Sequence, residues 1–278
     1  MNGPLGIIAG AGDLPRRTAE LATAAGRTVV VLGVSGFADP DFVAAYNGQS
    51  FGIGETGRQI RFLKEAGCQE IVFAGLVRRP DFGQLTFDEE GLRLLPALKE
   101  AAGKGDDALL RVVLGAFSAA GLHILGAEQA AQALLAPSGV IGRHAPGEGD
   151  WRDIRRAARA AEAIGQLDIG QGAVSAGGVV LALEAQEGTD QMLVRCASLP
   201  PTVRGEGGVL VKRPKPIQDA RVDLPTIGEE TVRRAAEARL SGIAVLAGGA
   251  LIVNRSAMIA LADQLGLFVY GFRPEEIV

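Results

Sequence analysis

The sequence predicts two α/β domains, the first of them with a parallel sheet. The chain has 278 residues, a length that favours two domains over one. Short apolar runs alternate with helical stretches at roughly 20-residue spacing, which is typical of βαβ units. A segment rich in glycine and proline, 138–150, separates two such halves. We therefore assign 1–137 to an N-terminal Rossmann-like domain, 138–150 to a linker and 151–278 to a C-terminal domain.

The elements of the N-terminal half follow from the spacing of its apolar residues. Short runs rich in β-branched residues indicate buried strands, and apolar positions three and four apart indicate helices. The predicted strands are 5–9, 28–32, 70–74 and 123–125. The predicted helices are 14–25, 57–66, 107–120 and 128–135.

The C-terminal half is also predicted to be α/β, although its strand order cannot be derived from the pattern. A helix is expected to follow the linker directly. The predicted helices are 151–164, 189–197, 229–240 and 255–265. The predicted strands are 178–184, 208–212, 243–246 and 267–270.

Composition excludes several classes of function. The net charge of −4 and the absence of a basic face argue against nucleic-acid binding. Two cysteines, Cys68 and Cys196, and two histidines, His123 and His144, supply little material for a zinc site or a histidine-centred triad. The first residues lack a signal-peptide pattern, and no apolar run reaches the roughly 18 residues of a membrane span. We expect a cytoplasmic enzyme or binding protein.

The first candidate site follows the first predicted strand. Gly10, Gly12, Asp13 and Leu14 form a glycine-rich turn into a helix, and exposed amides at a helix start favour phosphate. Pro15 occupies the third glycine position of the dinucleotide fingerprint, and no acid follows the second strand, so NAD is disfavoured. The turn is either a nucleotide or sugar-phosphate contact, or simply a tight βα connection.

A second loop follows the third predicted strand. It contains Gly75, Leu76, Arg78 and Arg79. Ligands collect at the carboxyl ends of parallel strands, so this loop should lie beside the first turn. One of the two arginines could bind phosphate, or both could be solvated cations. The loop 103–107 ends at a helix start, where its aspartates are either caps or ligands.

The C-terminal half carries a denser set of polar residues. Gln171 lies in a glycine-rich turn that enters a strand, and Thr189 and Asp190 begin a helix. These last two are either helix caps or ligands.

A proline-stiffened segment follows the next strand. Two lysines, two arginines and two aspartates fall within twelve residues, among them Lys212, Lys215, Asp219 and Asp223. Cations neutralise phosphate oxygens, and carboxylates bind Mg²⁺, which prefers hard oxygen ligands. The pattern therefore favours phosphoryl chemistry over a plain surface loop.

Five motifs in this order resemble one family. They are IAGAGDLP, GLVRRP, GKGDDALLR, DIGQGAV with EAQEGTD, and KRPKPIQDARVDLPTIG. The chain resembles, over essentially its whole length, the UDP-2,3-diacylglucosamine pyrophosphatases that are not of the calcineurin-like type. The resemblance implies hydrolysis to UMP and 2,3-diacylglucosamine 1-phosphate during lipid A synthesis, with Mg²⁺ required and water attacking the β-phosphorus. It also implies a substrate cleft between the two domains, a homodimer, and transient contact with inner-membrane lipid.

The resemblance further implies an essential aspartate, which corresponds to Asp223, with Asp219 as the alternative. On this hypothesis Asp223 acts near a Mg²⁺ that it binds together with Asp190, while Lys212 and Lys215 stabilise charge on the phosphates. Two rivals stay open. One is an NAD(P)-dependent oxidoreductase, suggested by the glycine turn, and the other is a non-catalytic carrier of nucleotide sugars or lipids.

Overall fold

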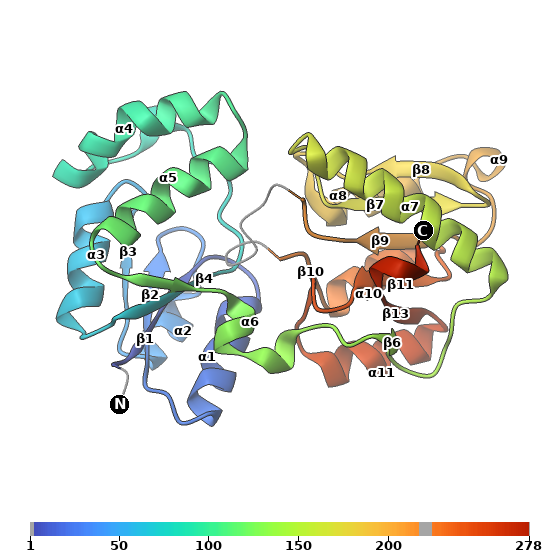
Figure 1. Cartoon of the computed structure of the whole chain (residues 1–278), viewed down its shortest axis with the longest axis horizontal. Coiled ribbons are helices and arrows are strands. Elements are labelled where there is room, and N and C mark those ends of the chain that lie inside the picture. The colour runs from blue at the N-terminus through green and yellow to red at the C-terminus, as the bar shows by residue number, and fades with distance from the viewer. Residues whose placement is uncertain (1–2, 217–223, 278) are drawn as a thin grey trace. The chain divides into compact units, whose positions relative to one another are not determined.

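The chain folds into two compact units, Met1–Ala133 and Leu134–Val278. A computed structural model describes residues 3–216 and 224–277 (Figure 1). Each unit holds its own main sheet, which confirms the prediction of two α/β domains. The segment 138–150, assigned above to a linker, contributes the short strand β6 and the first residues of helix α7 to the second unit.

The first unit contains a five-stranded sheet in which every pair of neighbours is parallel. The strand order is β3-β2-β1-β4-β5. All five residues of β1 are buried, as expected for a central strand with both faces covered. The bounds are β1 Leu5–Ala9, β2 Val29–Val34, β3 Gln49–Phe51, β4 Glu70–Ala74 and β5 His123–Leu125.

Helices connect the strands of this sheet. Asp88 fixes the start of two of them, because its carboxylate accepts hydrogen bonds from Gly91 N in α4 and from Arg58 N in α3, both at 2.8 Å. The predicted helix 128–135 is instead a single turn, α6, followed by a short 3₁₀ turn. The helices are α1 Leu14–Ala24, α2 Pro40–Ala45, α3 Thr56–Glu65, α4 Glu89–Ala102, α5 Asp106–Ala119 and α6 Ala127–Ala130.

The strand order creates a switch point at the centre of the sheet. The chain builds outward from β1 to β3 and then returns to place β4 on the other side of β1. In open α/β sheets the crevice for a ligand lies at the carboxyl ends of the two strands where the order reverses. The loops that follow β1 and β4 occupy this place in the first unit.

The second unit contains a mixed six-stranded sheet in the order β6-β13-β11-β9-β7-β8. Strands β9, β11 and β13 are parallel to one another, while β6 and β7 run antiparallel to their neighbours in this group and β8 runs antiparallel to β7. The bounds are β6 Gly139–Val140, β7 Gly172–Ala176, β8 Val179–Leu183, β9 Val209–Lys212, β11 Gly242–Leu246 and β13 Phe268–Phe272. A separate small ladder pairs β10, Thr226–Ile227, with β12, Leu251–Ile252.

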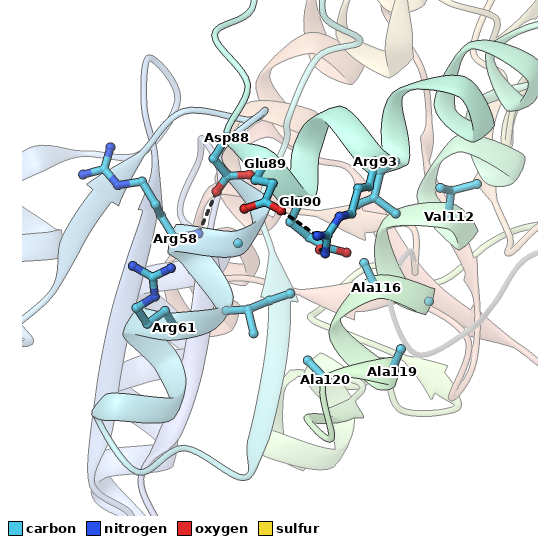
Figure 2. A pocket seen from close by; sticks show the side chains of 14 residues that line it. Arg58, Arg61, Asp88, Glu89, Glu90, Arg93, Val112, Ala116, Ala119 and Ala120 are labelled. Atoms are coloured by element: carbon cyan, nitrogen blue, oxygen red, sulfur yellow. Dashed lines mark hydrogen bonds and ion pairs between the residues drawn. The ribbon is translucent and has the colours of Figure 1, made fainter.

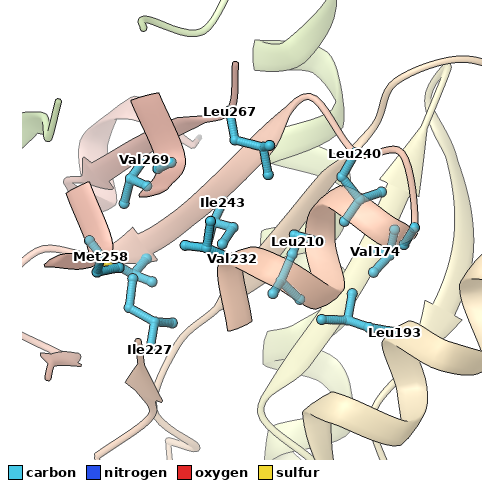
Figure 3. Packing of buried hydrophobic residues seen from close by; sticks show 14 of the residues in the cluster. Val174, Leu193, Leu210, Ile227, Val232, Leu240, Ile243, Met258, Leu267 and Val269 are labelled. Atoms are coloured by element: carbon cyan, nitrogen blue, oxygen red, sulfur yellow. The ribbon is translucent and has the colours of Figure 1, made fainter. Parts of the chain in front are cut away.

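Helices cover both faces of this sheet. On one face α7 packs its apolar stripe of Ile154, Ala157, Ala158 and Ala161 against the strands. On the other face the larger core includes Val174, Leu193, Leu210, Val232, Ile243 and Met258, to which α8, α10 and α11 contribute (Figure 3). The helices are α7 Glu148–Gln166, α8 Gly188–Ala197, α9 Pro201–Arg204, α10 Glu229–Glu237 and α11 Arg255–Leu265.

The stretch around the strand predicted at 178–184 is a hairpin of two strands, β7 and β8. The turn consists of Gly177 and Gly178, with φ angles of +59° and +83°. Two-residue hairpin turns of this kind need positive φ at both positions, which glycine supplies without strain. This hairpin places the residues before β7 and after β8 at the same edge of the sheet.

The side chain of Asp153, in α7, stabilises this hairpin turn by hydrogen bonding. Its carboxylate is only 4% exposed and accepts hydrogen bonds from Ser175 Oγ at 2.9 Å, Gly177 N at 3.0 Å and Gly178 N at 2.6 Å. We expect Asp153→Ala to lower the free energy of unfolding by about 3 kcal/mol, because one buried and two part-buried donors lose their acceptor. The control is Asp150→Ala, which removes one capping bond to Gly147 N and should cost about 1 kcal/mol. Urea denaturation followed by circular dichroism measures both, and equal losses would contradict this role.

Candidate functional site

The loops after β1 and β4 are joined at the switch point of the first unit. Ala11 N donates to the Leu76 carbonyl and Leu76 N donates to the Ala11 carbonyl, each at 2.9 Å. The expectation that the two loops lie side by side is therefore confirmed.

Glycines permit this close approach. A Cβ at Gly10 would lie 2.6 Å from the Leu76 carbonyl oxygen, and one at Gly75 would lie 2.6 Å from the Ala11 carbonyl oxygen. Gly75 also has a φ of +90°, which side chains rarely adopt. The two motifs thus form one structural unit whose glycines serve the contact between the loops.

The surface of this joined pair of loops is open to solvent. Gly12 and Asp13 are exposed, Leu14 begins α1 half-buried, and Leu76 is 59% exposed. Backbone, a carboxylate and apolar side chains are therefore exposed together at the switch point. Such a mixture suits a ligand that has both polar and apolar parts.

The two arginines of the β4 loop differ in their surroundings. Arg79 donates to the Ala102 carbonyl and lies 3.7 Å from Asp106 Oδ1, so it ties its loop to the α4–α5 connection. Arg78 is exposed. Of the two phosphate candidates, Arg78 is therefore the better placed to reach a ligand. Asp106 and Asp107 open α5, and Asp107 pairs with Arg111 at 2.8 Å, which favours their structural interpretation.

A cavity of about 680 Å³ lies elsewhere in the first unit, between α3, α4 and α5 (Figure 2). Several charged side chains on its rim pair within the protein. Arg93 pairs with Glu89 at 2.6 Å and with Glu90 at 3.3 Å, and Arg58 pairs with Glu55. None of the candidate residues from the sequence lines it. We do not assign the site to this cavity.

The second unit gathers its polar residues at one edge of its sheet. Lys212 ends β9 and lies directly opposite Gly172, which begins β7. Glu184, just after β8, donates its backbone N–H to the Gly172 carbonyl at 2.9 Å. Lys212, Gly172 and Glu184 therefore lie side by side at this end of the sheet. The side chains of Lys212 and Glu184 begin on the face covered by α8, because Leu210 and Ala182, two residues before them, belong to the core on that face.

The glycines of the DIGQG motif make room for Glu184. A Cβ at Gly172 would lie 2.5 Å from Glu184 Oε2, and one at Gly170 would overlap the Glu184 carbonyl oxygen. The two motifs DIGQGAV and EAQEGTD are therefore the two sides of one hairpin end. Glu184 was not among the candidates from the sequence, because its place beside Gly172 depends on how the strands pair.

Three candidate residues from the sequence flank the hairpin end that carries Glu184. Thr189, at the start of α8, donates its hydroxyl to Glu184 Oε1 at 2.9 Å. Asp190 follows it in the first turn of α8 and is exposed. Gln171 is half-buried; its backbone carbonyl accepts from Arg213 N at 3.1 Å, and its side-chain oxygen is buried without a hydrogen-bond partner among the described residues.

The two lysines have distinct partners. Lys212 is 5% exposed, and its Nζ donates to the Thr226 carbonyl at 3.2 Å. Lys215 forms an ion pair with Asp168 at 2.6 Å, and both side chains are largely buried. Lys212 is thus a buried cation that donates to a neutral carbonyl oxygen, while Lys215 is paired with a carboxylate.

The remaining candidates are the two aspartates after β9, possible metal-binding clusters and the two cysteines. Asp219 and Asp223 lie outside the described residues. Within the described ranges, histidine, cysteine and acidic side chains form no cluster of three that could hold a metal. Burial raises the pKa of the Cys68 thiol to about 11 and also raises that of Cys196, so neither thiol is an activated nucleophile.

The whole chain matches known sequences of one family. The profile of the LpxI N-terminal domain matches residues 4–134, and that of the LpxI C-terminal domain matches residues 137–270. The chain belongs to the LpxI family. A curated LpxI relative from Caulobacter vibrioides, the UDP-2,3-diacylglucosamine pyrophosphatase LpxI, is 51% identical over 276 residues, which is 98% of either chain.

The two LpxI domain profiles correspond closely to the two units of the structure. Two groups of the motifs that carried the resemblance lie at the ends of strands: the joined loops at the LpxI N-terminal switch point, and the hairpin end beside Lys212 in the LpxI C-terminal domain.

Proposed function

We propose that this chain hydrolyses the pyrophosphate of UDP-2,3-diacylglucosamine to UMP and 2,3-diacylglucosamine 1-phosphate in lipid A biosynthesis. The observation that carries the proposal is its 51% identity, over nearly the full length, to a relative bearing that enzyme name. The fold agrees with it, because the first unit has the strand order of nucleotide-binding sheets.

The two sites suit different parts of the substrate. The joined loops of the first unit, with Gly10, Gly12, Asp13, Leu76 and Arg78, suit the nucleotide-sugar half. The edge of the second unit suits the reacting phosphates, because Lys212 is a buried cation and charges interact more strongly where water is excluded. A substrate cleft between the domains stays a prediction.

We further propose that the reaction requires Mg²⁺. The donors at the edge of the second unit fit this ion, since they are carboxylate and hydroxyl oxygens and include a buried carboxylate oxygen without a partner, Glu184 Oε2. Asp190 and Asp223 would hold the ion, which when bound neutralises charge on the phosphoryl oxygens.

Different residues of the chain have different roles in the proposed reaction. Asp223, or Asp219 in its place, orients the attacking water and accepts its proton while the β-phosphorus is attacked, and UMP leaves. Lys212 and Lys215 neutralise negative charge that develops on the phosphates. Thr189 and Gln171 contact the polar groups around the reacting centre.

Two further parts of the proposal concern location and assembly. We propose a homodimer in the cytoplasm that contacts the inner membrane transiently to collect its acylated substrate. Within residues 3–216 and 224–277, no helix combines the length and the apolar character needed to cross a bilayer. Each acyl chain prefers an apolar site by roughly 0.8 kcal/mol per buried methylene. The substrate therefore needs an apolar surface on the protein before it can leave the membrane.

Release of UMP tests the proposed reaction. Purified protein, UDP-2,3-diacylglucosamine and Mg²⁺ are incubated together, and UMP is measured by chromatography with and without EDTA. UMP that forms only with Mg²⁺ is expected. Binding of the substrate without any UMP would instead favour a carrier, and a fluorescence change on adding NADH would favour an oxidoreductase.

The role of the first-unit turn has its own test in Gly12→Val. Gly12 has a φ of +90° and open space around it, so valine strains the turn rather than clashing with a neighbour. We expect KM for the substrate to rise roughly tenfold, equivalent to ~1.4 kcal/mol of lost binding. Gly26→Val is the matched control, because Gly26 also has positive φ, +82°, and open space, yet follows α1 at the opposite end of that helix. Equal KM values in both folded variants would remove the turn from the site.

A further inference from the structure

Glu184 is buried, and only one of its two carboxylate oxygens accepts a hydrogen bond from the described residues. The side chain is 7% exposed, and Oε1 accepts the Thr189 hydroxyl at 2.9 Å. Oε2 is buried and has no hydrogen-bond partner among the described residues. It lies over Gly172, where any larger residue would displace it. The chain therefore holds this carboxylate in place through one oxygen and leaves the other without a partner.

An ionised carboxylate in such a place needs a positive partner. Burying a charge is costly unless it is paired or coordinates a metal. Lys212 lies on the same face of the sheet, on the other side of Gly172. Yet Lys212 donates to the Thr226 carbonyl, and within the described part of the chain no ion pair joins it to Glu184. The charge on Glu184 thus lacks a protein cation in contact with it.

A divalent cation answers this requirement. Mg²⁺ is held in proteins by one or two carboxylates together with waters and substrate phosphates, so a cluster of three acidic residues is unnecessary. The terminal torsion of a glutamate is broad, and rotation about it moves both oxygens together, so coordination through Oε2 would shift Oε1 as well, and the rotatable Thr189 hydroxyl would follow it. The Thr189 hydroxyl already contacts this carboxylate, and Asp190 follows Thr189 in the first turn of α8.

We propose that Glu184 is a magnesium ligand of this chain, coordinating the ion through Oε2. This rests on the proposed function, since the phosphates of the substrate complete the coordination. Glu184, at the end of the hairpin, is thus a proposed ligand in addition to Asp190 and Asp223. The proposal also explains the glycines at 170 and 172, because a side chain at either position would displace Glu184 from the end of the sheet where Lys212 lies.

The test is metal binding by Glu184→Gln, which is isosteric and keeps an oxygen for the Thr189 hydroxyl. Mn²⁺ replaces Mg²⁺ as the probe, and free Mn²⁺ is measured by electron paramagnetic resonance, first alone and then with UMP. The matched control is Glu187→Gln, which removes the same charge three residues later from a side chain paired with Arg195. Melting temperatures of the metal-free proteins show whether each variant is folded.

We expect Glu184→Gln to weaken Mn²⁺ binding at least ~10-fold in one or both conditions, while Glu187→Gln binds as the wild type does. Equal Mn²⁺ affinity in the wild type and Glu184→Gln under both conditions would overturn the proposal. So would a wild type that binds no Mn²⁺ in either condition. Failure of the proposed function would show separately, as a wild type that binds Mn²⁺ but releases no UMP.

Discussion

Replacing Asp223 with alanine should lower turnover at least ~10²-fold while substrate still binds. A positioned acid or base contributes 10²–10⁴-fold to typical hydrolytic reactions, so its loss gives an effect of this size. Asp223 lies in the segment that follows β9, and the carboxyl end of that strand holds Lys212. Steady-state kinetics give kcat, and equilibrium binding of the substrate in EDTA shows whether the variant still recognises it.

Asp219→Ala is the matched control for that experiment. It removes the same side chain from the same proline-stiffened segment, four positions earlier, and should leave kcat within a few-fold of the wild type. A normal kcat in Asp223→Ala together with a large loss in Asp219→Ala would transfer the role to Asp219. Normal kcat in both would exclude this segment as the source of the catalytic carboxylate.

Replacing Lys212 with methionine should lower kcat by about 10²–10³-fold, the range for removing one preorganised electrostatic contact to a transition state. The buried ammonium is replaced by an apolar side chain of similar length, so the fold should tolerate the change. The expected loss falls mainly on kcat, because the charge on the phosphates grows in the transition state. Measurement of kcat and KM with saturating Mg²⁺ separates the two effects.

Lys215→Met should behave differently because Lys215 is already paired. Its loss leaves the Asp168 carboxylate buried without its counter-ion, which should cost about 3 kcal/mol of stability. Lys212→Met should show the larger kcat loss with the smaller fall in unfolding free energy. If the two variants lost activity and stability alike, the expected difference between Lys212 and the paired Lys215 would be wrong.

The parallel sheet of the first unit could be predicted from the sequence because its central strands are continuous apolar runs. The strands predicted at 5–9 and 70–74 have the observed bounds, since the first is wholly buried and the second largely so. The short strands β3, β6, β10 and β12 were not predicted, because two or three residues carry no periodicity. Helix α4 was also missed; it contains Pro96, a residue that argues against a helix interior.

The parts of the candidate site that could be predicted from the sequence are short motifs that directly follow a strand. The glycine turns after β1 and β4 were identified because each follows a strand, and the parallel topology then brings them together. Glu184 was missed because its position depends on the antiparallel pairing of β7 with β8 and β9, and β7 was not predicted as a strand of its own. The signal was the glycine pair at 177–178, which is typical of a tight hairpin turn.

The most direct test of the account is hydrolysis of UDP-2,3-diacylglucosamine in ¹⁸O-enriched water with Mg²⁺, followed by phosphorus NMR. An ¹⁸O label shifts the resonance of the phosphorus that water attacked. We expect the label in 2,3-diacylglucosamine 1-phosphate and unlabelled UMP, because attack at the β-phosphorus leaves the new oxygen on the sugar phosphate. Label in UMP would contradict the assigned direction of attack, and intact substrate after prolonged incubation would contradict the proposed function itself.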